Sequence, residues 1–383
     1  MNITQHIHLV LGLALLLGFG LGGLMQLTHF CTMGAVADIV LFKSFQRAKL
    51  FALALAVALI GTQTLVVLEW INISHTVYNN DKLLWLSHSI GGLCFGSGMV
   101  LAGGCISKNL LRLGTGSLKA LTVLTVVALS AAMTVRGIFS PLRINGLDLF
   151  LLQIPNTLQQ YFINGSNIYL NTYFNTYFNT YFNTYLDNYF IKPDSALFIV
   201  SLIIGLGLIL WSISKRDERT FKHCGAGLAI GSLIVMGWVL SGVLAYVPEH
   251  PDTLQEAFLS TASNKMENVL PVASLVSWLN YLLLFSDTSQ TITLAMAISL
   301  GMVLGSAAVC LYQKKFHWQG FSDTRDWAYH ILGAGLMGFG GVVAMGCSIS
   351  HGLGGLSVLS LSSLLTFIAI ILGAMFTLKY LEQ

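Results

Sequence analysis

Apolar residues run in long blocks along this chain, and short polar segments separate the blocks. A transmembrane helix needs about 20 apolar residues. Nine blocks approach this length, and they cover residues 7–27, 50–71, 84–104, 118–139, 195–214, 224–247, 291–313, 328–346 and 357–378. A further segment, 269–286, contains Pro271 and Asn280 and is expected to be re-entrant or interfacial. The pattern predicts an all-α polytopic membrane protein with about nine transmembrane helices.

The composition agrees with a bilayer as the solvent. Hydrophobic residues make up 55% of the chain and charged residues only 9%, whereas soluble domains carry about 25% charged residues. Membrane lipids are therefore the expected surroundings. The net charge of +3 comes without a basic stripe of the kind that binds nucleic acid, so no nucleic-acid partner is expected.

The charged residues predict the membrane topology of the chain, that is, the side on which each connection lies. Basic residues follow the first, third, fifth and seventh blocks, and the connections between these are poor in basic residues or acidic. The basic residues are Lys43, Arg47, Lys49, Lys108, Arg112, Lys119, Lys215, Arg216, Arg219, Lys222, Lys314, Lys315 and Arg325. Because cytoplasmic loops are enriched in lysine and arginine, we expect nine crossings, an external N-terminus and a cytoplasmic C-terminus.

Two of the blocks are copies of each other. Residues 85–105 align without gaps on residues 327–347, and nine of the 21 positions are identical. An internal repeat in an apolar chain is typical of transporters built from two related halves. With the predicted topology, the two copies cross the membrane in opposite directions, which indicates inverted-topology repeats with short broken helices.

The repeat divides the chain into four parts. We expect an N-terminal membrane repeat over 1–140, an external low-complexity loop over 141–194, a connecting transmembrane helix over 195–219 and a C-terminal inverted repeat over 220–383. The loop contains a four-residue Asn-Thr-Tyr-Phe repeat that starts at Asn171. We interpret it as a tolerated loop expansion, and an amphipathic stripe on the membrane surface is the alternative.

Each copy of the repeat ends in a glycine and a cysteine, Gly104-Cys105 and Gly346-Cys347. Cys31 has similar surroundings, because it also follows an apolar block. Hydroxyl-bearing residues stand shortly after the three cysteines, namely Thr32, Ser107, Ser348 and Ser350. Serine and threonine are natural helix N-caps, so each cysteine is expected to open a short half-helix inside the membrane.

The start of a helix presents free backbone N–H groups and the positive end of the helix dipole, which together attract anions. An arriving anion disfavours thiolates, so the thiols are expected to stay protonated and to act as weak donors to a soft, sulphur-containing anion. His351 is expected to line the same path. The predicted substrate-binding residues are Cys31, Cys105, Cys347, Gly104, Gly346, Ser107, Ser348 and His351.

Other chemistry fits the sequence less well. Thiolates can hold Cu(I) or Zn, but these cysteines form no Cys-x-x-Cys pair, and no metal is expected. The alternative function is a membrane thiol enzyme for redox or sulphur transfer. Such an enzyme needs a base beside its nucleophile, and only His29 and His351 stand near one of the cysteines. No catalytic residue and no cofactor are predicted, and the cysteines interpreted as packing residues are Cys94, Cys224 and Cys310.

At these residues the chain resembles the YeeE/YedE family of bacterial inner-membrane proteins, whose characterised members take up thiosulfate. The strongest match is the segment 95–105, while 25–32 and 345–357 resemble the first and last family motifs. The resemblance covers nearly the whole chain except 141–194. It implies an hourglass of inverted halves, in which the three motif cysteines pass the anion inward through transient S–H···S contacts.

The resemblance also implies a partner protein, and the chain departs from the family pattern at one place. Family analogy suggests a cytoplasmic sulphur-carrier or sulphurtransferase protein that traps the imported anion. Many members carry arginines just before the first cysteine, where this chain has Leu27-Thr28-His29. We expect Cys31 to act near the external side, with Cys105 and Cys347 deeper along the path.

Overall fold

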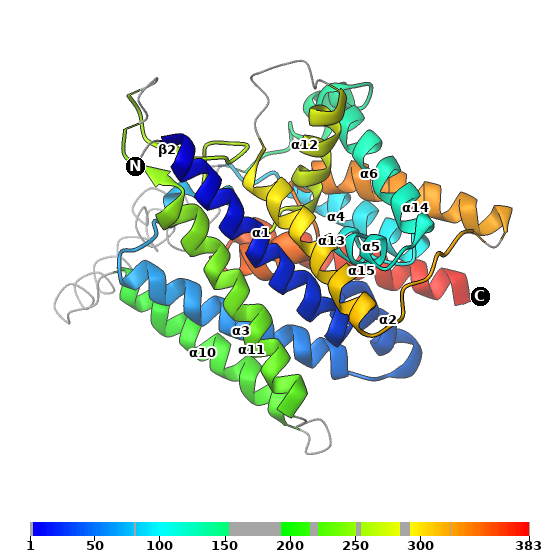
Figure 1. The fold of residues 1–383 in the computed structure, drawn as a ribbon, viewed down its shortest axis with the longest axis horizontal. Helices are drawn as coiled ribbons and strands as arrows, with labels where there is room; N and C mark the ends of the chain where they lie inside the picture. Colours follow the sequence, from blue (N-terminus) through cyan, green and yellow to red (C-terminus); the bar gives the residue numbers. More distant parts are fainter. Residues whose placement is uncertain are drawn as a thin grey trace, which may run out of the picture.

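The computed structural model describes residues 3–79, 82–152, 193–214, 221–249, 254–283, 292–321 and 323–382. Most of these residues are helical (Figure 1). The elements are α1 (Ile3–Thr28), α2 (Thr32–Phe42), α3 (Gln46–Val67), η1 (Ile73–His75), α4 (Trp85–Leu101), α5 (Ile106–Gly114), α6 (Leu118–Arg136), α7 (Ser140–Leu142), η2 (Arg143–Leu147), α10 (Pro193–Ile213), α11 (Phe221–Val239), η4 (Leu240–Leu244), β1 (Tyr246–Val247), β2 (Ala257–Phe258), α12 (Pro271–Leu283), α13 (Leu294–Tyr312), α14 (Thr324–Val343), η5 (Ser350–Gly355) and α15 (Leu361–Glu382). The Asn-Thr-Tyr-Phe repeat lies outside the described residues.

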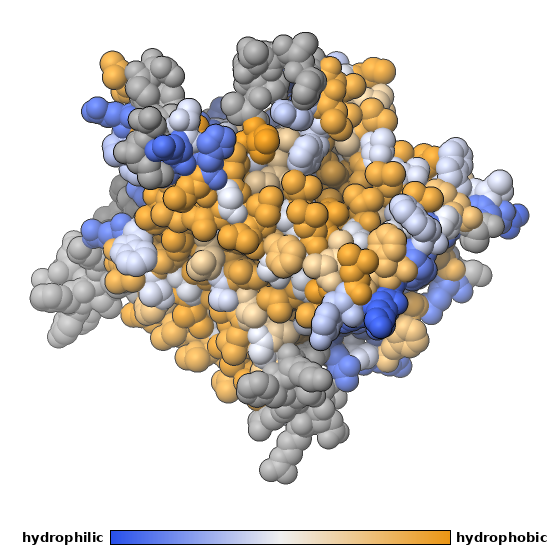
Figure 2. All heavy atoms as spheres, in the orientation of Figure 1, coloured by the Kyte–Doolittle hydropathy of each residue, from blue (hydrophilic) through white to orange (hydrophobic). Residues whose placement is uncertain are grey.

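Apolar side chains cover the outside of the helices. Figure 2 shows a broad apolar area over α1, α11 and α13, with polar residues gathered toward the edges of the face. Leu16, Ile203 and Leu210 are 64%, 65% and 71% exposed. Soluble proteins rarely expose apolar patches of this extent, so this surface faces lipid. The chain is an all-α membrane protein.

Seven helical stretches of the described residues are long and apolar enough to cross a membrane. They are Thr4–Phe42, Gln46–Val67, Trp85–Gly114, Leu118–Arg136, Cys224–Leu244, Leu294–Tyr312 and Leu361–Glu382. Each overlaps one of the nine predicted spans. The apolar part of α10, Leu197–Ile213, is shorter than these seven. The remaining predicted span forms α14, whose polar first turn and many glycines lower its hydropathy.

Glycines bring α1 and α13 into close contact, and the two helices lie side by side in Figure 1. A Cβ atom at Gly18 would collide with the backbone of Ile298, and one at Gly22 would collide with the backbone of Met302. Because the contacts advance in the same direction along both helices, α1 and α13 are parallel. Small residues at such crossings are what allow membrane helices to pack closely.

The two copies of the sequence repeat, α4 and α14, also pack on each other. Gly91 lies against Ala344, and Gly98 lies against Gly333. These contacts run in opposite directions along the two helices, so α4 and α14 are antiparallel. The ends of the two helices that precede the repeated cysteines therefore point in opposite directions.

Two connecting segments pair beside the small sheet of β1 and β2. Val77 N–H donates to Met266 O at 3.2 Å, and Met266 N–H donates to His75 O at 2.8 Å. The next helix, α12, has 13 residues and is too short to span a membrane. This length agrees with the expectation of a re-entrant or interfacial segment.

Candidate thiol-lined site

Each of the three cysteines singled out by the sequence follows a helix that ends in the same way. The residue two positions before the cysteine has a positive φ, which is 51° at His29, 65° at Gly103 and 61° at Met345. The N–H one position before the cysteine donates to the carbonyl oxygen five residues earlier, from Phe30 to Met25 at 3.1 Å, from Gly104 to Met99 at 2.8 Å and from Gly346 to Gly341 at 2.8 Å. This Schellman ending turns the chain out of the helix.

The cysteine then opens the next helical segment. Cys31 is the N-cap of α2, and Cys105 is the N-cap of α5. Cys347 precedes a helical segment that starts at Ser348 and continues into η5. The first N–H groups of a helix have no partner within it and carry the positive end of its dipole. The structure thus places all three cysteines at the start of a half-helix, as the sequence predicts.

Three hydroxyls next to these cysteines are buried and lack a hydrogen-bond partner among the described residues: Thr32, Ser107 and Ser348. The three residues are 3%, 1% and 0% exposed. Leaving a buried hydroxyl unpaired costs about 1–3 kcal/mol. Three such hydroxyls beside three thiols indicate a place for a ligand with acceptor atoms. Thr32 was not among the predicted site residues, and its position directly after Cys31 is the signal that could have found it.

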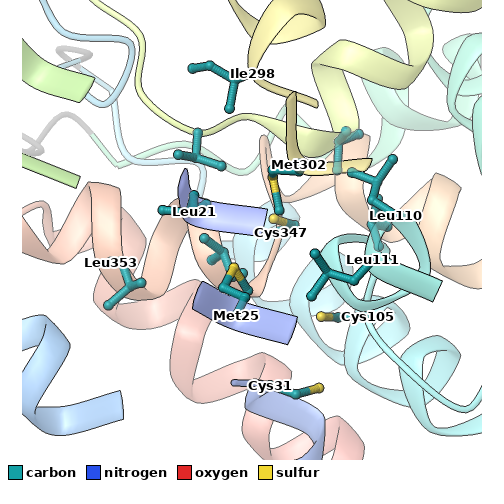
Figure 3. Packing of buried hydrophobic residues seen from close by; sticks show 14 of the residues in the cluster. Leu21, Met25, Cys31, Cys105, Leu110, Leu111, Ile298, Met302, Cys347 and Leu353 are labelled. Carbon is teal, nitrogen blue, oxygen red and sulfur yellow. The ribbon is translucent and has the colours of Figure 1, made fainter. Parts of the chain in front are cut away.

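The three thiols lie in one buried cluster (Figure 3). Those of Cys31 and Cys105 are in hydrogen-bonding contact. Cys105 lies between Cys31 and Cys347. The sulphur atoms of Met25 and Met302 lie in the same region of the figure. The three cysteines, which are distant in the sequence, therefore form a row inside the protein.

Cys347 is held by a compact set of hydrogen bonds. Its N–H donates to Ser350 Oγ at 2.6 Å, and the Ser350 N–H donates to Cys347 Sγ at 3.5 Å. The hydroxyl of Tyr78 donates to the Ser350 carbonyl oxygen at 2.7 Å. These bonds connect the third cysteine to the paired segments 71–79 and 254–270.

His351 lies beside Cys347, but both of its ring nitrogens contact the protein. Nε2 is 2.9 Å from the Ala344 carbonyl oxygen, and Nδ1 is 3.0 Å from Ser363 Oγ. Because a carbonyl oxygen only accepts, Nε2 carries the proton of a neutral ring. The ring stands edge-on to that of His88, with 6.2 Å between the centroids. This arrangement fits a residue that fixes the end of α14 better than one that contacts a ligand.

The two predicted glycines differ in how strictly the structure requires them. A Cβ atom at Gly346 would lie 2.5 Å from Ser350 Oγ and 2.7 Å from His351 Nε2. At Gly104 the nearest atom would be Lys108 Cγ, at 3.1 Å, which belongs to a flexible side chain. Only at Gly346 would a side chain displace the groups that hold a cysteine.

Positive side chains gather at the end of the row where Cys31 lies. They are Arg47, Lys108, Arg112 and Lys315, and Arg47 is paired with Asp38 at 3.3 Å. Lys108 interacts electrostatically with both Cys31 and Cys105. An excess of positive charge raises the local concentration of anions, so this end of the site attracts anions.

The other cysteines have different surroundings. Cys310 is buried within α13, and Cys94 and Cys224 are half-buried. Within the described ranges, no group of three or more His, Cys, Asp or Glu side chains is arranged to hold a metal ion.

Comparisons with known proteins agree with these features. The chain matches the family model described as sulphur transport over residues 27–376. It is 27% identical to the thiosulfate transporter TsuA of Spirochaeta thermophila over 362 residues, which is 94% of this chain and 95% of that protein. It is 26% identical to TsuA of Escherichia coli over 348 residues, which is 88% of this chain and 85% of that protein. A stretch of 97 residues is 36% identical to the probable transporter YedE of Escherichia coli, covering 25% of this chain and 22% of that protein. The chain therefore belongs to the sulphur-transport family that includes YeeE and YedE, and it is a membrane transporter rather than an enzyme.

Proposed function

We propose that this chain imports a small sulphur-containing anion across the bacterial inner membrane, and that thiosulfate is the anion. One observation carries the proposal: three half-helices, each opened by a cysteine and each bearing an unpaired buried hydroxyl, meet in one cluster. The relatives named thiosulfate transporters, which align over most of their length, support the choice of anion.

The chemistry of thiosulfate suits these groups. Its terminal sulphur is soft and polarisable and accepts weak S–H donors, while its oxygens are harder and accept O–H and N–H donors. Moving an ion from water into a low-dielectric interior costs of order 20 kcal/mol before compensation. A hydrogen bond to a charged group returns about 1.5–3 kcal/mol. Several donors must therefore engage the anion at each cysteine, and the thiol, the hydroxyl and the helix N-terminus supply them.

The contacts among the thiols support an order along the path. Cys105 interacts with both of the other cysteines, so it is the middle position of a relay. Cys347 is tied through Ser350 to Tyr78 of the segment 71–79. Cys31 lies at the opposite end, close to the basic cluster. The anion would pass from Cys347 to Cys105 and then to Cys31.

The proposed membrane topology keeps the N-terminus external and the C-terminus cytoplasmic. The antiparallel packing of α4 and α14 supports inverted repeats. This topology also changes the expected position of Cys31. α1 has 26 residues and must run inward before the chain reaches Cys31, so Cys31 belongs near the cytoplasmic side rather than the external side. The basic cluster beside it fits the positive-inside rule.

The same proposal assigns the parts of the chain. Residues 1–140 and 220–383 would form the two inverted halves, 195–219 the connecting transmembrane helix and 141–194 an external loop. An anion released beside the basic cluster would be available to a cytoplasmic sulphur-carrier or sulphurtransferase protein, which would keep import favourable by consuming it.

A growth experiment tests this function. A bacterium that lacks sulphate uptake is supplied with this chain and grown on thiosulfate as its sulphur source. Rescue is expected, and it should be lost with Cys105→Ala and with Cys347→Ala. The matched controls are Cys224→Ala and Cys310→Ala, which should still rescue at equal protein levels in the membrane. Equal loss in both sets would contradict a special role for the three clustered cysteines.

A further inference from the structure

Glu267 is a buried carboxyl group that the thiol relay does not use. The residue is 1% exposed. Oε1 accepts hydrogen bonds from the Ala262 N–H at 2.9 Å, the Ser263 N–H at 3.3 Å and the Ser263 hydroxyl at 3.1 Å. Oε2 is buried without a partner among the described residues. Oε1 therefore anchors the loop, whereas no hydrogen bond among the described residues offsets the lost hydration of Oε2.

The loop that carries Glu267 is joined to the Cys347 end of the site. Its neighbour Met266 pairs with the segment that contains Tyr78. Tyr78 joins the two places, because its hydroxyl donates to the Ser350 carbonyl oxygen at 2.7 Å and its ring stands edge-on to that of His351. A charge on Glu267 therefore lies in the loop that packs against the support of Cys347, where it would oppose an arriving anion.

The groups around Glu267 determine what its proton can respond to. From the segment 71–79 the titratable side chains are His75 and Tyr78, and from its own loop they are Glu256 and Lys265. Lys265 Nζ donates to the Asn79 carbonyl oxygen at 3.3 Å. Beyond Tyr78 lie Cys347 and His351. From α11 the loop meets Ile234 and Gly237, neither of which titrates.

Burial raises the pKa of the Glu267 carboxyl, because the charged form loses its hydration. A second negative charge nearby raises it further for the same reason that two carboxylates rarely ionise side by side. Binding of an anion and binding of a proton must therefore assist each other, and this assistance is reciprocal.

We propose that Glu267 is a proton-binding site linked to anion binding at Cys347. The carboxylate takes a proton from the external solution as the anion arrives, so Oε2 becomes neutral and one of the two incoming charges is offset. An inside-negative membrane potential opposes the entry of a dianion, and a proton bound at the entrance reduces the charge assembled there. The inference rests on the proposed function, since it needs an anion at Cys347.

Isothermal titration calorimetry of the purified full chain with thiosulfate tests the link. Titrations in two buffers with different ionisation enthalpies measure the protons taken up on binding, and repeats between about pH 5.5 and about pH 8 give the pH dependence. Thiosulfate stays a dianion over this range and takes up no proton itself. Glu267→Gln is the informative variant, because its amide oxygen can keep the three bonds of Oε1 while the side chain stays neutral.

The wild-type protein should take up protons and should bind at least about fivefold more weakly at the high end of the range. Glu267→Gln should take up none and should keep its affinity throughout, and the exposed neighbour changed in Glu256→Gln should behave as the wild type. Binding without proton uptake in the wild type, or unchanged uptake in Glu267→Gln, would overturn this inference alone. No binding heat in the wild type would overturn the proposed function, and this inference with it.

Discussion

The thiols of Cys31 and Cys105 are in hydrogen-bonding contact, although the two residues open different helices. The contact brings the N-termini of α2 and α5 together. Two positive helix ends that converge on this pair of cysteines favour an anion at the point of contact. Cys347 repeats the geometry on the other side of Cys105, so the site consists of three similar positions and not of one pocket.

Gly346→Ala should impair transport because it disturbs the hydrogen bonds that hold Cys347. The added Cβ would lie 2.5 Å from Ser350 Oγ and 2.7 Å from His351 Nε2, so the bonds that hold the cysteine must shift. Overpacking of this kind costs about 1–3 kcal/mol. We expect a lower melting temperature in detergent and a loss of thiosulfate uptake. Gly335→Ala on α14 is the control, since nothing lies within 4 Å of its Cβ position; a similar defect in both variants would contradict the role of Gly346.

Ser107→Ala and Ser348→Ala should separate stability from binding. Their hydroxyls have no hydrogen-bond partner among the described residues, so removing them should leave the melting temperature unchanged or raise it. Each should weaken thiosulfate binding by about tenfold or more, because a bond to a charged ligand is worth about 1.5–3 kcal/mol.

The control for the hydroxyls is Ser299→Ala. Ser299 Oγ donates to the Met296 carbonyl oxygen at 2.8 Å and accepts from Trp278 Nε1 at 3.2 Å. Its removal should lower the melting temperature and leave the affinity for thiosulfate unchanged. If Ser107→Ala and Ser348→Ala behaved like this control, their hydroxyls would have a structural role and no contact with the anion.

Glu267 should make stability depend on pH in a defined direction. Burial raises the pKa of its carboxyl above the ordinary 4.5, so the folded protein holds the proton more tightly than the unfolded chain. Stability should therefore fall as pH rises from 4.5 through the raised value. Glu267→Gln cannot lose a proton, so melting curves should show it more stable than the wild type at about pH 8 and similar to it at about pH 4. An equal difference at both pH values would refute this sign.

Gly22→Ala should destabilise the bundle at the crossing of α1 and α13. Its Cβ would collide with the backbone of Met302, which cannot move as a side-chain end can. We expect a cost of about 1–3 kcal/mol, measured as a drop in melting temperature. Gly12 lies on the same helix with nothing within 4 Å of its Cβ position, and Gly12→Ala should melt as the wild type.

Local signals in the sequence were enough to predict the helical membrane class and the three half-helices. The glycine and cysteine at the end of each repeat copy, followed by a hydroxyl, mark the break and the new N-cap. The equivalence of Cys31 to the repeated pair is weaker in sequence, because His29 takes the left-handed position that Gly103 takes before Cys105. A backbone conformation shared by different residue types leaves little trace in an alignment.

Tertiary contacts account for what the sequence could not predict. The order of the cysteines depends on which helix ends meet. The parallel packing of α1 and α13 depends on glycines, but a glycine in a helix does not indicate which other helix it will contact. His351 was predicted to line the path because it follows Cys347, and the structure adds that Ala344 and Ser363 lie at its two ring nitrogens. The polar partners of a buried side chain come from distant segments, which local patterns do not specify.

Uptake of ³⁵S-labelled thiosulfate into proteoliposomes tests the central claim most directly. The purified chain is compared with Cys31→Ala, Cys105→Ala, Cys347→Ala and the control Cys310→Ala at equal incorporation. We expect the wild type and Cys310→Ala to accumulate label and the three variants of the clustered thiols to show a large loss, greatest at Cys105 because it lies between the other two. Full uptake by Cys105→Ala and Cys347→Ala would contradict the account.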